Sequence, residues 1–263
     1  MIVDTRRLFC RLLRTLDIAA VCDVGSMDGS DALLFRRILP GAAILALEPN
    51  PRNFALMTAD ERLRRAGIRM LPVAASDRRG EAPFYVVEHG TVREKPRRGM
   101  SSLYARADWA RVTSAVQVTT ARLDELLPGE SLDAGPLALW IDTEGMAFEV
   151  IRGGEGVLAR TRMIHVEVET QPFIGAAQKL FAEVARTLLD AGFVLLATDQ
   201  RTDVLQFNAL FISAECSRTK MADIVRRAHY EQIRRKVTGA IVRLLPMRLK
   251  RAFGSRFYQT RCQ

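Results

Sequence analysis

Cysteine and histidine are scarce in this chain of 263 residues, which contains four cysteines and three histidines. The cysteines are scattered over Cys10, Cys22, Cys216 and Cys262, with no Cys-x-x-Cys pair and no histidine nearby at metal-ligand spacing. This pattern argues against a disulfide framework and against a structural zinc site. We therefore expect reduced structural thiols and a cytoplasmic location.

Long apolar runs are also missing from the chain. No uncharged apolar run approaches the ~20 residues that a membrane-spanning helix requires. Arginine and aspartate interrupt every apolar run at the N-terminus, so we expect no signal peptide there. Four leucines in this segment share one helical face, namely Leu8, Leu12, Leu13 and Leu16. They predict an N-terminal helix within residues 1–19 that packs on the domain.

A net positive charge is absent from most of the chain, because the excess of basic residues is confined to its last part. The formal net charge is +9, but residues 218–263 alone contain 13 lysines or arginines against two acids. Residues 1–217 contain 26 basic and 28 acidic side chains. A nucleic-acid-binding domain would be expected to present a basic surface, so we expect no nucleic-acid partner.

The basic segment, residues 216–263, is predicted to form a helical tail. Within it, Ile233–Phe253 places apolar residues at helical spacing among lysines and arginines, and Pro246 should kink or end the helix. A basic helix with an apolar face suits peripheral contact with an anionic membrane, here the inner membrane face. The alternative is a helix that packs its apolar face on its own domain or on a partner.

The most informative segment runs from Val21 to Asn50 and has the layout of one strand–helix–strand unit. An apolar strand precedes a turn with two glycines, a helix over Leu33–Leu39 and a second strand over Ala43–Leu47. The residues at the two strand ends and in the turn are Asp23, Gly25, Ser26, Gly29, Glu48 and Pro49. A glycine-bearing first turn and an acid at the tip of the second strand are typical of nucleoside binding.

This layout predicts a role for each end of the unit. The turn amides near Gly25, with Asp23, would hold one end of the nucleoside, and the Glu48 carboxylate would accept both ribose hydroxyls. The spacing Gly25-x-x-x-Gly29 lacks the third glycine that lets a backbone close on a pyrophosphate, which favours S-adenosylmethionine over NAD. The alternative is an ordinary tight turn followed by a solvated acid.

Strand-like segments alternate with helical ones over residues 20–215. The expected strands are Val21–Gly25, Ala43–Glu48, Arg69–Ala75, Leu137–Asp142, Met163–Glu169, Phe193–Thr198 and Phe207–Ser213. Such alternation predicts an α/β domain with a doubly wound, mostly parallel sheet covered on both faces. The last two strands are joined by a short polar stretch, so the last strand should be antiparallel. Residues 82–120 form an insertion in which two strand-like stretches flank a basic, turn-rich loop.

Two acids follow the fourth strand, at the edge where open α/β sheets bind ligands. The apolar pair Trp140-Ile141 precedes Asp142 and Glu144, so Asp142 should emerge from a buried strand. Desolvation there raises a carboxyl pKa and suits a general base. Alternatively, Asp142 caps a helix that begins near Met146.

A second polar cluster lies on the next strand, where three ionisable residues alternate with apolar ones. His165, Glu167 and Glu169 therefore share one face of that strand. Glu169, nearest the strand end, is the candidate for contact with a substrate, whereas His165 is interpreted as a hydrogen-bonded core residue. The oxygens of Asp142, Glu144 and Glu169 would permit a bound Mg²⁺, which the sequence does not require.

Taken in order, these motifs resemble the FkbM-type family of S-adenosylmethionine-dependent methyltransferases, over roughly residues 20 to 213. The most specific matches are DVGSMDG at 23–29, EPNP at 48–51, and IDTEG at 141–145 followed by a helix with two glycines. Two positions differ from the family pattern: Met27-Asp28 follows the first glycine where asparagine is usual, and Trp140 stands where lysine is usual.

The resemblance implies a Rossmann-like methyltransferase fold and S-adenosylmethionine as cofactor. It also implies an O-methyltransferase that acts on a hydroxyl of a small-molecule or glycan acceptor, either a sugar or a polyketide-type product. In such a fold Ser76 and Asp77, after the third strand, would meet the adenine edge, although the same residues suit a turn or cap. Two other functions are a nucleotide-dependent oxidoreductase, disfavoured by the missing glycine, and a non-catalytic cofactor-binding or glycan-binding module.

Overall fold

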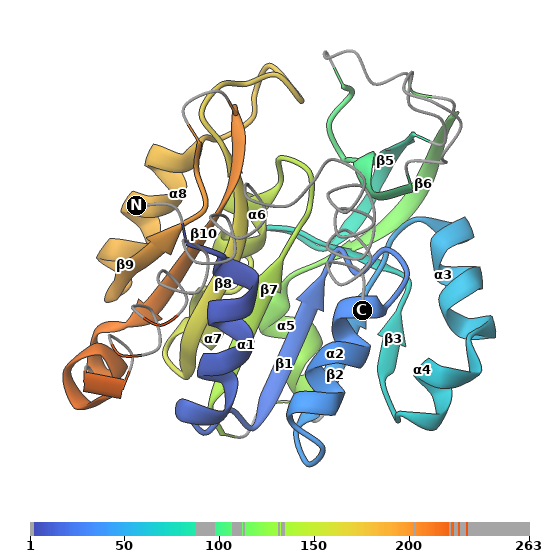
Figure 1. The fold of residues 1–263 in the computed structure, drawn as a ribbon. Helices are drawn as coiled ribbons and strands as arrows, with labels where there is room; N and C mark the ends of the chain where they lie inside the picture. The colour runs from blue at the N-terminus through green and yellow to red at the C-terminus, as the bar shows by residue number, and fades with distance from the viewer. Residues whose placement is uncertain are drawn as a thin grey trace, which may run out of the picture.

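A seven-stranded sheet forms the centre of the computed structural model (Figure 1). Its strands are β1 (Ala20–Val24), β2 (Ala43–Leu47), β3 (Arg69–Leu71), β7 (Leu137–Ile141), β8 (Thr161–Glu169), β9 (Phe193–Thr198) and β10 (Gln206–Ser213). They lie in the order β3-β2-β1-β7-β8-β10-β9, and β10 runs antiparallel to both of its neighbours. The predicted doubly wound sheet with an antiparallel last strand is therefore confirmed.

The structure describes most of the chain up to residue 220 and little beyond it. The described residues are 3–87, 98–106, 112, 114–130, 132, 135–201, 204–220, 222, 223, 226 and 230. Among the helices in this part of the chain, none has the length and apolar content needed to cross a membrane.

Helices cover both faces of the central sheet (Figure 1). One face packs on α1 (Thr5–Thr15), α2 (Ser30–Ile38), α3 (Pro51–Ala59) and α4 (Glu61–Arg65). The opposite face packs on α5 (Leu123–Gly129), α6 (Ala147–Arg152), α7 (Glu155–Leu158) and α8 (Phe181–Asp190). Strands β1 and β7 are buried along their whole length, which explains why β7 is an uninterrupted apolar run and why Asp23 is the one acidic residue of β1.

Helix α1 confirms the predicted N-terminal helix. Its four predicted leucines have no exposed surface, and it packs against α2, β8 and β10. The side chain of Asp4 caps the helix by accepting from the Arg7 amide at 3.1 Å. Directly before it, the Val3 amide donates to the Thr198 carbonyl at the end of β9, at 3.2 Å. The first turn of α1 therefore lies at the carboxyl edge of the parallel strands.

The strands of the insertion, β5 (Gly80–Val86) and β6 (Ser114–Ala121), form a second, smaller sheet with β4 (Val73–Ala75), which precedes the insertion; the order is β4-β6-β5. The single strand predicted over Arg69–Ala75 is wrong, because β3 belongs to the central sheet and β4 to the small one. Pro72 separates them, since proline lacks the amide that would continue the ladder. A short helix, η1 (Arg98–Met100), precedes a bridge between Ser102 and Tyr85 of β5.

The beginning of the predicted tail returns to α1. Residues 214–220 are helical, and the Lys220 ammonium donates to the Thr15 carbonyl at 2.7 Å and pairs with Asp17. Further along, the Arg11 guanidinium lies 4.5 Å from the centre of the Tyr230 ring. The predicted amphipathic segment Ile233–Phe253 lies outside the described residues.

Candidate active site

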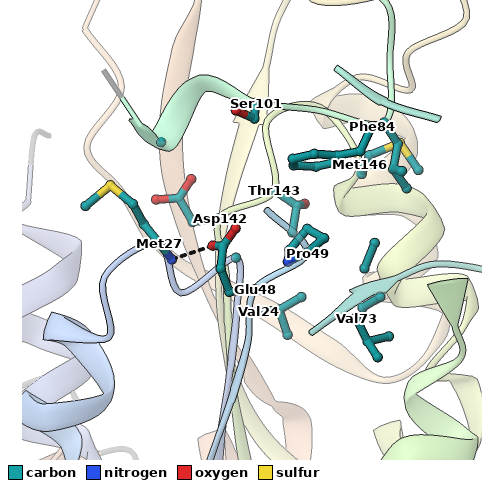
Figure 2. Close-up of a pocket in the computed structure, with 15 residues that line it drawn as sticks. Val24, Met27, Glu48, Pro49, Val73, Phe84, Ser101, Asp142, Thr143 and Met146 are labelled. Carbon is teal, nitrogen blue, oxygen red and sulfur yellow. Dashed lines mark hydrogen bonds between the residues drawn. The ribbon is translucent and has the colours of Figure 1, made fainter. Parts of the chain in front are cut away.

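Two cavities open at the carboxyl edge of the sheet, and the first lies over the ends of β1, β2 and β7 (Figure 2). Its volume is ≈ 50 Å³. Its apolar walls come from Val24, Pro49, Val73, Phe84, Leu103 and Met146. Its acidic side chains are Glu48 and Asp142, and no lysine or arginine occurs among the described residues that line it. The walls suit an apolar, flat group, while the acids suit hydroxyls or a cation.

Glycine is required where the turn after β1 approaches the end of β7. Gly25 has φ +85°, and a Cβ atom there would lie 1.9 Å from the Asp142 carbonyl oxygen. Gly29, at φ +76°, forms the N-cap of α2, where a Cβ atom would lie 2.6 Å from the Leu63 side chain. Both predicted glycines thus hold a left-handed backbone against a close neighbour, which an L-residue disfavours.

Asp23 and Ser26 shape this turn from within rather than lining the cavity. Asp23 is buried at the end of β1, and its Oδ2 accepts from the Ser26 hydroxyl at 2.6 Å. Desolvation raises the pKa of Asp23 well above its usual value. The amides of Gly25 and Ser26 donate to the Leu47 carbonyl at 3.0 and 2.9 Å. These two turn amides therefore already have partners on β2.

Glu48 lies in the cavity wall, directly after β2 (Figure 2). Its Oε2 accepts from the Met27 amide at 2.7 Å, and its Oε1 accepts from the Asn50 amide at 2.8 Å. Burial, opposed by these hydrogen bonds, raises the pKa of Glu48 to about 7. Pro49, next in the chain, forms part of the same wall. The two amides fix the orientation of the carboxylate that was predicted to bind ribose.

Ser76 and Asp77 do not line this cavity among the described residues. They follow β4, where the Ser76 hydroxyl donates to Asp77 Oδ1 at 3.2 Å. Asp77 is exposed, and its carbonyl accepts from the Arg122 guanidinium at 2.8 Å. The nearby part of the cavity wall is formed by Val73–Ala75 of β4, and contact of Ser76 and Asp77 with an adenine edge stays a prediction.

The second cavity is larger and more polar, with a volume of ≈ 500 Å³. It lies between the first turn of α1, the start of α2 and the β9–β10 hairpin. Trp140 and His165 contribute to its lining. Asp142 also lines this cavity and is the residue that the two sets of described lining residues share.

The strand register brings Asp142 close to Glu167. Trp140 pairs with His165 across β7 and β8, and Ile141 pairs with Val166, so the next residues on the two strands are Asp142 and Glu167. One oxygen each of Asp142, Glu144 and Glu167 lies within 4.8 Å of the others. This trio, with Glu167 in place of Glu169, is close enough to share a cation or a proton.

Glu169 lies beyond the trio and is held by amides. Its Oε2 accepts from Gln178 at 2.6 Å and its Oε1 from Gln206 at 3.1 Å. The same Gln206 amide donates to Glu167 at 2.7 Å. Burial, opposed by the two glutamines, raises the pKa of Glu169 to about 7.

Glu144 reaches the trio through a turn rather than an extended chain. Its φ is 49°, so the chain does not stay extended between the end of β7 and Glu144. The Ser102 hydroxyl donates to the Glu144 carbonyl at 2.7 Å, and the Arg106 guanidinium donates to its Oε2 at 2.9 Å. The side chains of Arg106 and Glu144 are 1% and 12% exposed. Arg106 comes from the insertion, where nothing in the sequence singled it out.

Burial raises the pKa of all three acids in the trio. It is the largest cause for Asp142, opposed by a hydrogen bond with Glu167, although Asp142 remains open to both cavities. The pKa of Glu144 is raised to about 7 by burial and by the Asp142 charge, with Arg106 opposing. Burial raises the pKa of Glu167 well above its usual range. Glu144 can therefore take up a proton near neutral pH, and burial favours the protonated form of Asp142 and Glu167 as well.

The helix-cap alternative for Asp142 does not apply. Helix α6 begins at Ala147, its N-cap is Met146, and no side chain caps it. His165 matches its interpretation as a core residue, because its ring stacks on Trp140 at 3.7 Å and its Nε2 lies 3.0 Å from the Thr5 hydroxyl. Burial lowers the pKa of His165 to about 3.

Comparisons with known proteins agree with this geometry. The model of the methyltransferase FkbM domain matches residues 23–195. The 2-O-methyltransferase NoeI of Sinorhizobium fredii (strain NBRC 101917 / NGR234) is 31% identical over 165 residues, covering 57% of this chain and 63% of that protein. The chain thus matches less than two thirds of that relative's length.

Solved structures of methyltransferases are also similar. Methyltransferase FkbM from Methylobacillus flagellatus KT has a TM-score of 0.48 at 11% identity, covering 74% of this chain and 44% of that chain. Magnesium protoporphyrin IX methyltransferase (ChlM) from Synechocystis PCC 6803 has a TM-score of 0.44 at 11% identity, covering 80% and 78%. Because the family model extends from β1 to β9, over more than half of the chain, the protein belongs to the FkbM methyltransferase family.

Proposed function

We propose that this protein is an S-adenosylmethionine-dependent O-methyltransferase acting on a hydroxyl of a sugar, glycan or polyketide-type acceptor. The observation that carries the proposal is the position of Asp142, which lines both the narrow apolar cavity and the wide polar one. A carboxylate at their junction can remove a proton from an acceptor in one cavity, next to a cofactor in the other. The activity of NoeI, a 2-O-methyltransferase, supports oxygen as the receiving atom.

The side chains of the first cavity fit S-adenosylmethionine. Apolar walls that include Val73, Phe84 and Leu103 suit the adenine ring, and Glu48 suits the two ribose hydroxyls. The described lining residues include no basic side chain for phosphates, whereas Glu48 and Asp142 favour a cationic sulfonium. At ≈ 50 Å³ the cavity must widen to admit a nucleoside, and Met146 is the kind of flexible side chain that can move aside.

The residues of the chain would contribute in three ways to methyl transfer. When bound, S-adenosylmethionine supplies an electrophilic methyl group and leaves as a neutral thioether. Asp142 accepts the proton of the attacking hydroxyl, so that the oxygen becomes a better nucleophile. Glu167 shares a hydrogen bond with Asp142 and is itself held by Gln206, which orients the base. The walls of the two cavities hold the cofactor and the acceptor next to each other, and this positioning lowers the activation barrier for methyl transfer.

Calorimetry with S-adenosylhomocysteine, NAD and NADP tests the proposal. We expect only S-adenosylhomocysteine to bind, because the described cavity walls carry no cation for a pyrophosphate. Binding of NAD or NADP instead would favour an oxidoreductase. Binding of S-adenosylhomocysteine without methyl transfer to any hydroxylated acceptor would favour a non-catalytic module.

A further inference from the structure

The larger cavity is built mostly by segments outside the residues that match the family model. Ten of its fifteen lining residues lie outside residues 23–195. Four of them, Asp4 to Arg7, come from the first turn of α1 and the residue before it, and six come from the β9–β10 hairpin, between Asp199 and Asn208. The family-matched part of the chain supplies the floor, including Asp142. The other two walls therefore come from segments that the family model does not match.

We propose that this cavity binds the acceptor as an uncharged, hydroxyl-rich ring, and that the first turn of α1 and the β9–β10 hairpin select it. The inference rests on the proposed function, because it assigns the acceptor site of that reaction. Asp142 joins the cavity to the narrower one, so a hydroxyl of a ring bound here lies beside the base.

The polar groups of the cavity are held in place before any ligand binds. Asp199 Oδ1 accepts from the Asn208 amide at 2.7 Å, and Oδ2 accepts from the Asn208 side chain at 3.0 Å. The Thr5 hydroxyl donates to Asp199 Oδ2 at 3.4 Å and lies 3.0 Å from His165 Nε2. One hydrogen-bonded set thus joins α1, β8 and the hairpin into a rigid wall.

The chemistry of this wall favours hydroxyl groups. Carboxylates accept hydrogen bonds, while the side-chain amides of Gln206 and Asn208 both donate and accept, and a hydroxyl can do the same. A site that pairs with hydroxyls discriminates strongly against analogues that lack them, because its buried polar groups would lose their partners. Trp140 and Phe207 add apolar surface for the carbon skeleton of a ring.

The charges of the cavity disfavour an anionic ligand. Five acids line it against three arginines, namely Asp4, Asp31, Asp142, Glu167 and Asp199 against Arg6, Arg7 and Arg201. Arg6 already forms an ion pair with Asp31, and Arg7 forms one with Asp4 at 3.3 Å. Asp142 and Glu167 share a hydrogen bond and therefore a proton, so four negative charges remain against three positive ones. A carboxylate or phosphate on the acceptor would still meet a net negative charge.

Two adjacent hairpin residues provide a matched test. Val204 is 40% exposed and lines the cavity, whereas Leu205 is 43% exposed and is not among its lining residues. Val204→Trp and Val204→Tyr should both fill the cavity. Leu205→Trp is the control, because it adds the same bulk at the neighbouring position outside the cavity lining. The probe is saturation-transfer NMR on protein saturated with S-adenosylhomocysteine, using D-glucose, D-galactose, D-mannose and D-glucuronate.

We expect saturation transfer to at least one neutral sugar and none to D-glucuronate. The signal should disappear in Val204→Trp and Val204→Tyr and persist in Leu205→Trp, with melting temperatures confirming that each variant is folded. Three results would overturn the inference: no neutral-sugar signal with wild-type protein, equal transfer to D-glucuronate, or a signal that survives in folded Val204 variants. Calorimetry with S-adenosylhomocysteine separates the two proposals, since failure to bind it contradicts the cofactor assignment and not the cavity assignment.

Discussion

Single acids at strand ends carry the chemistry of this protein because their strands are buried. Glu48 follows β2 and Asp142 follows β7, and both strands are almost wholly inaccessible to water. Desolvation raises the pKa of each carboxyl, while backbone amides or neighbouring acids hold its orientation. A substitution at either position should therefore change one function and leave the fold in place.

Replacing Asp142 by Asn should slow turnover without weakening cofactor binding. The change keeps the size of the side chain and removes its ability to accept a proton. We expect the rate of methyl transfer to fall by roughly 10²–10⁴, the usual contribution of a general base. Single-turnover kinetics with labelled S-adenosylmethionine measure the rate, and calorimetry measures the affinity. A variant with full activity would move the role to Glu144 or Glu167, the other acids of the trio.

Replacing Glu48 by Ala should weaken the binding of S-adenosylhomocysteine. The ribose hydroxyls lose a charged acceptor, which is worth about 1.5–3 kcal/mol. Glu81→Ala is a suitable control, because Glu81 is an exposed acid on β5 that does not line the cavity. Equal affinity of a folded Glu48→Ala protein and the wild type would contradict the assignment of this cavity to the nucleoside.

At the scale of elements, the turn after β1 determines how closely β1, α2 and β7 approach one another. The Gly25 backbone packs against the carbonyl of Asp142, and Gly29 packs against Leu63 of α4. The small sheet and the segment around Ser102 add a further contact, since Ser102 holds the Glu144 backbone. Backbone contacts between separate elements thus place the acids.

Gly25→Ala should damage both stability and cofactor binding. The new Cβ atom would lie 1.9 Å from the Asp142 oxygen in a left-handed conformation, so the turn must shift. We expect a loss of more than ~1 kcal/mol in the free energy of unfolding, and weaker binding of S-adenosylhomocysteine. Gly41→Ala is the control, because no atom lies within 4 Å of a Cβ atom there. Thermal unfolding that is unchanged by Gly25→Ala would contradict the close approach.

At the scale of the whole molecule, buried acids should make the protein more stable in mild acid. Burial raises the pKa of seven carboxyls, namely Asp23, Glu48, Asp142, Glu144, Glu149, Glu167 and Glu169. In the unfolded chain such groups titrate near pH 4. The folded protein therefore binds more protons between about pH 4 and 7, and its stability rises as the pH falls through that window.

His165 has the opposite effect on stability. Its pKa is lowered to about 3 in the folded protein, so below about pH 6.5 the unfolded chain binds a proton that the folded protein does not, and unfolding is favoured. One histidine is outnumbered by seven acids, so the melting temperature should increase from pH 7.5 to pH 5.5. Scanning calorimetry across this range measures the slope, and Glu167→Gln should reduce it. A melting temperature that falls steadily with acidification would show that these carboxyls are ionised in the folded protein.

Local patterns in the sequence determined the order of strands and helices along the chain, the buried face of α1 and the antiparallel direction of β10. They also determined that Glu48 and Asp142 lie at strand ends. Each depends on spacing within a few residues or on chemistry at a strand end, so neighbours along the chain suffice to predict it. Pro72 was a local signal too, and it marks the break between β3 and β4.

Only the tertiary structure decided which distant groups meet. The register of β7 against β8 places Glu167, rather than Glu169, beside Asp142, and the pairing of β10 with β8 brings Gln206 to Glu169. Arg106 reaches Glu144 from an insertion, and α1 meets a hairpin almost two hundred residues away to enclose the larger cavity. The order of strands within the sheet and the register between distant strands arise from packing of the whole domain. Residue spacing along the chain does not show which residues of two distant strands lie opposite each other.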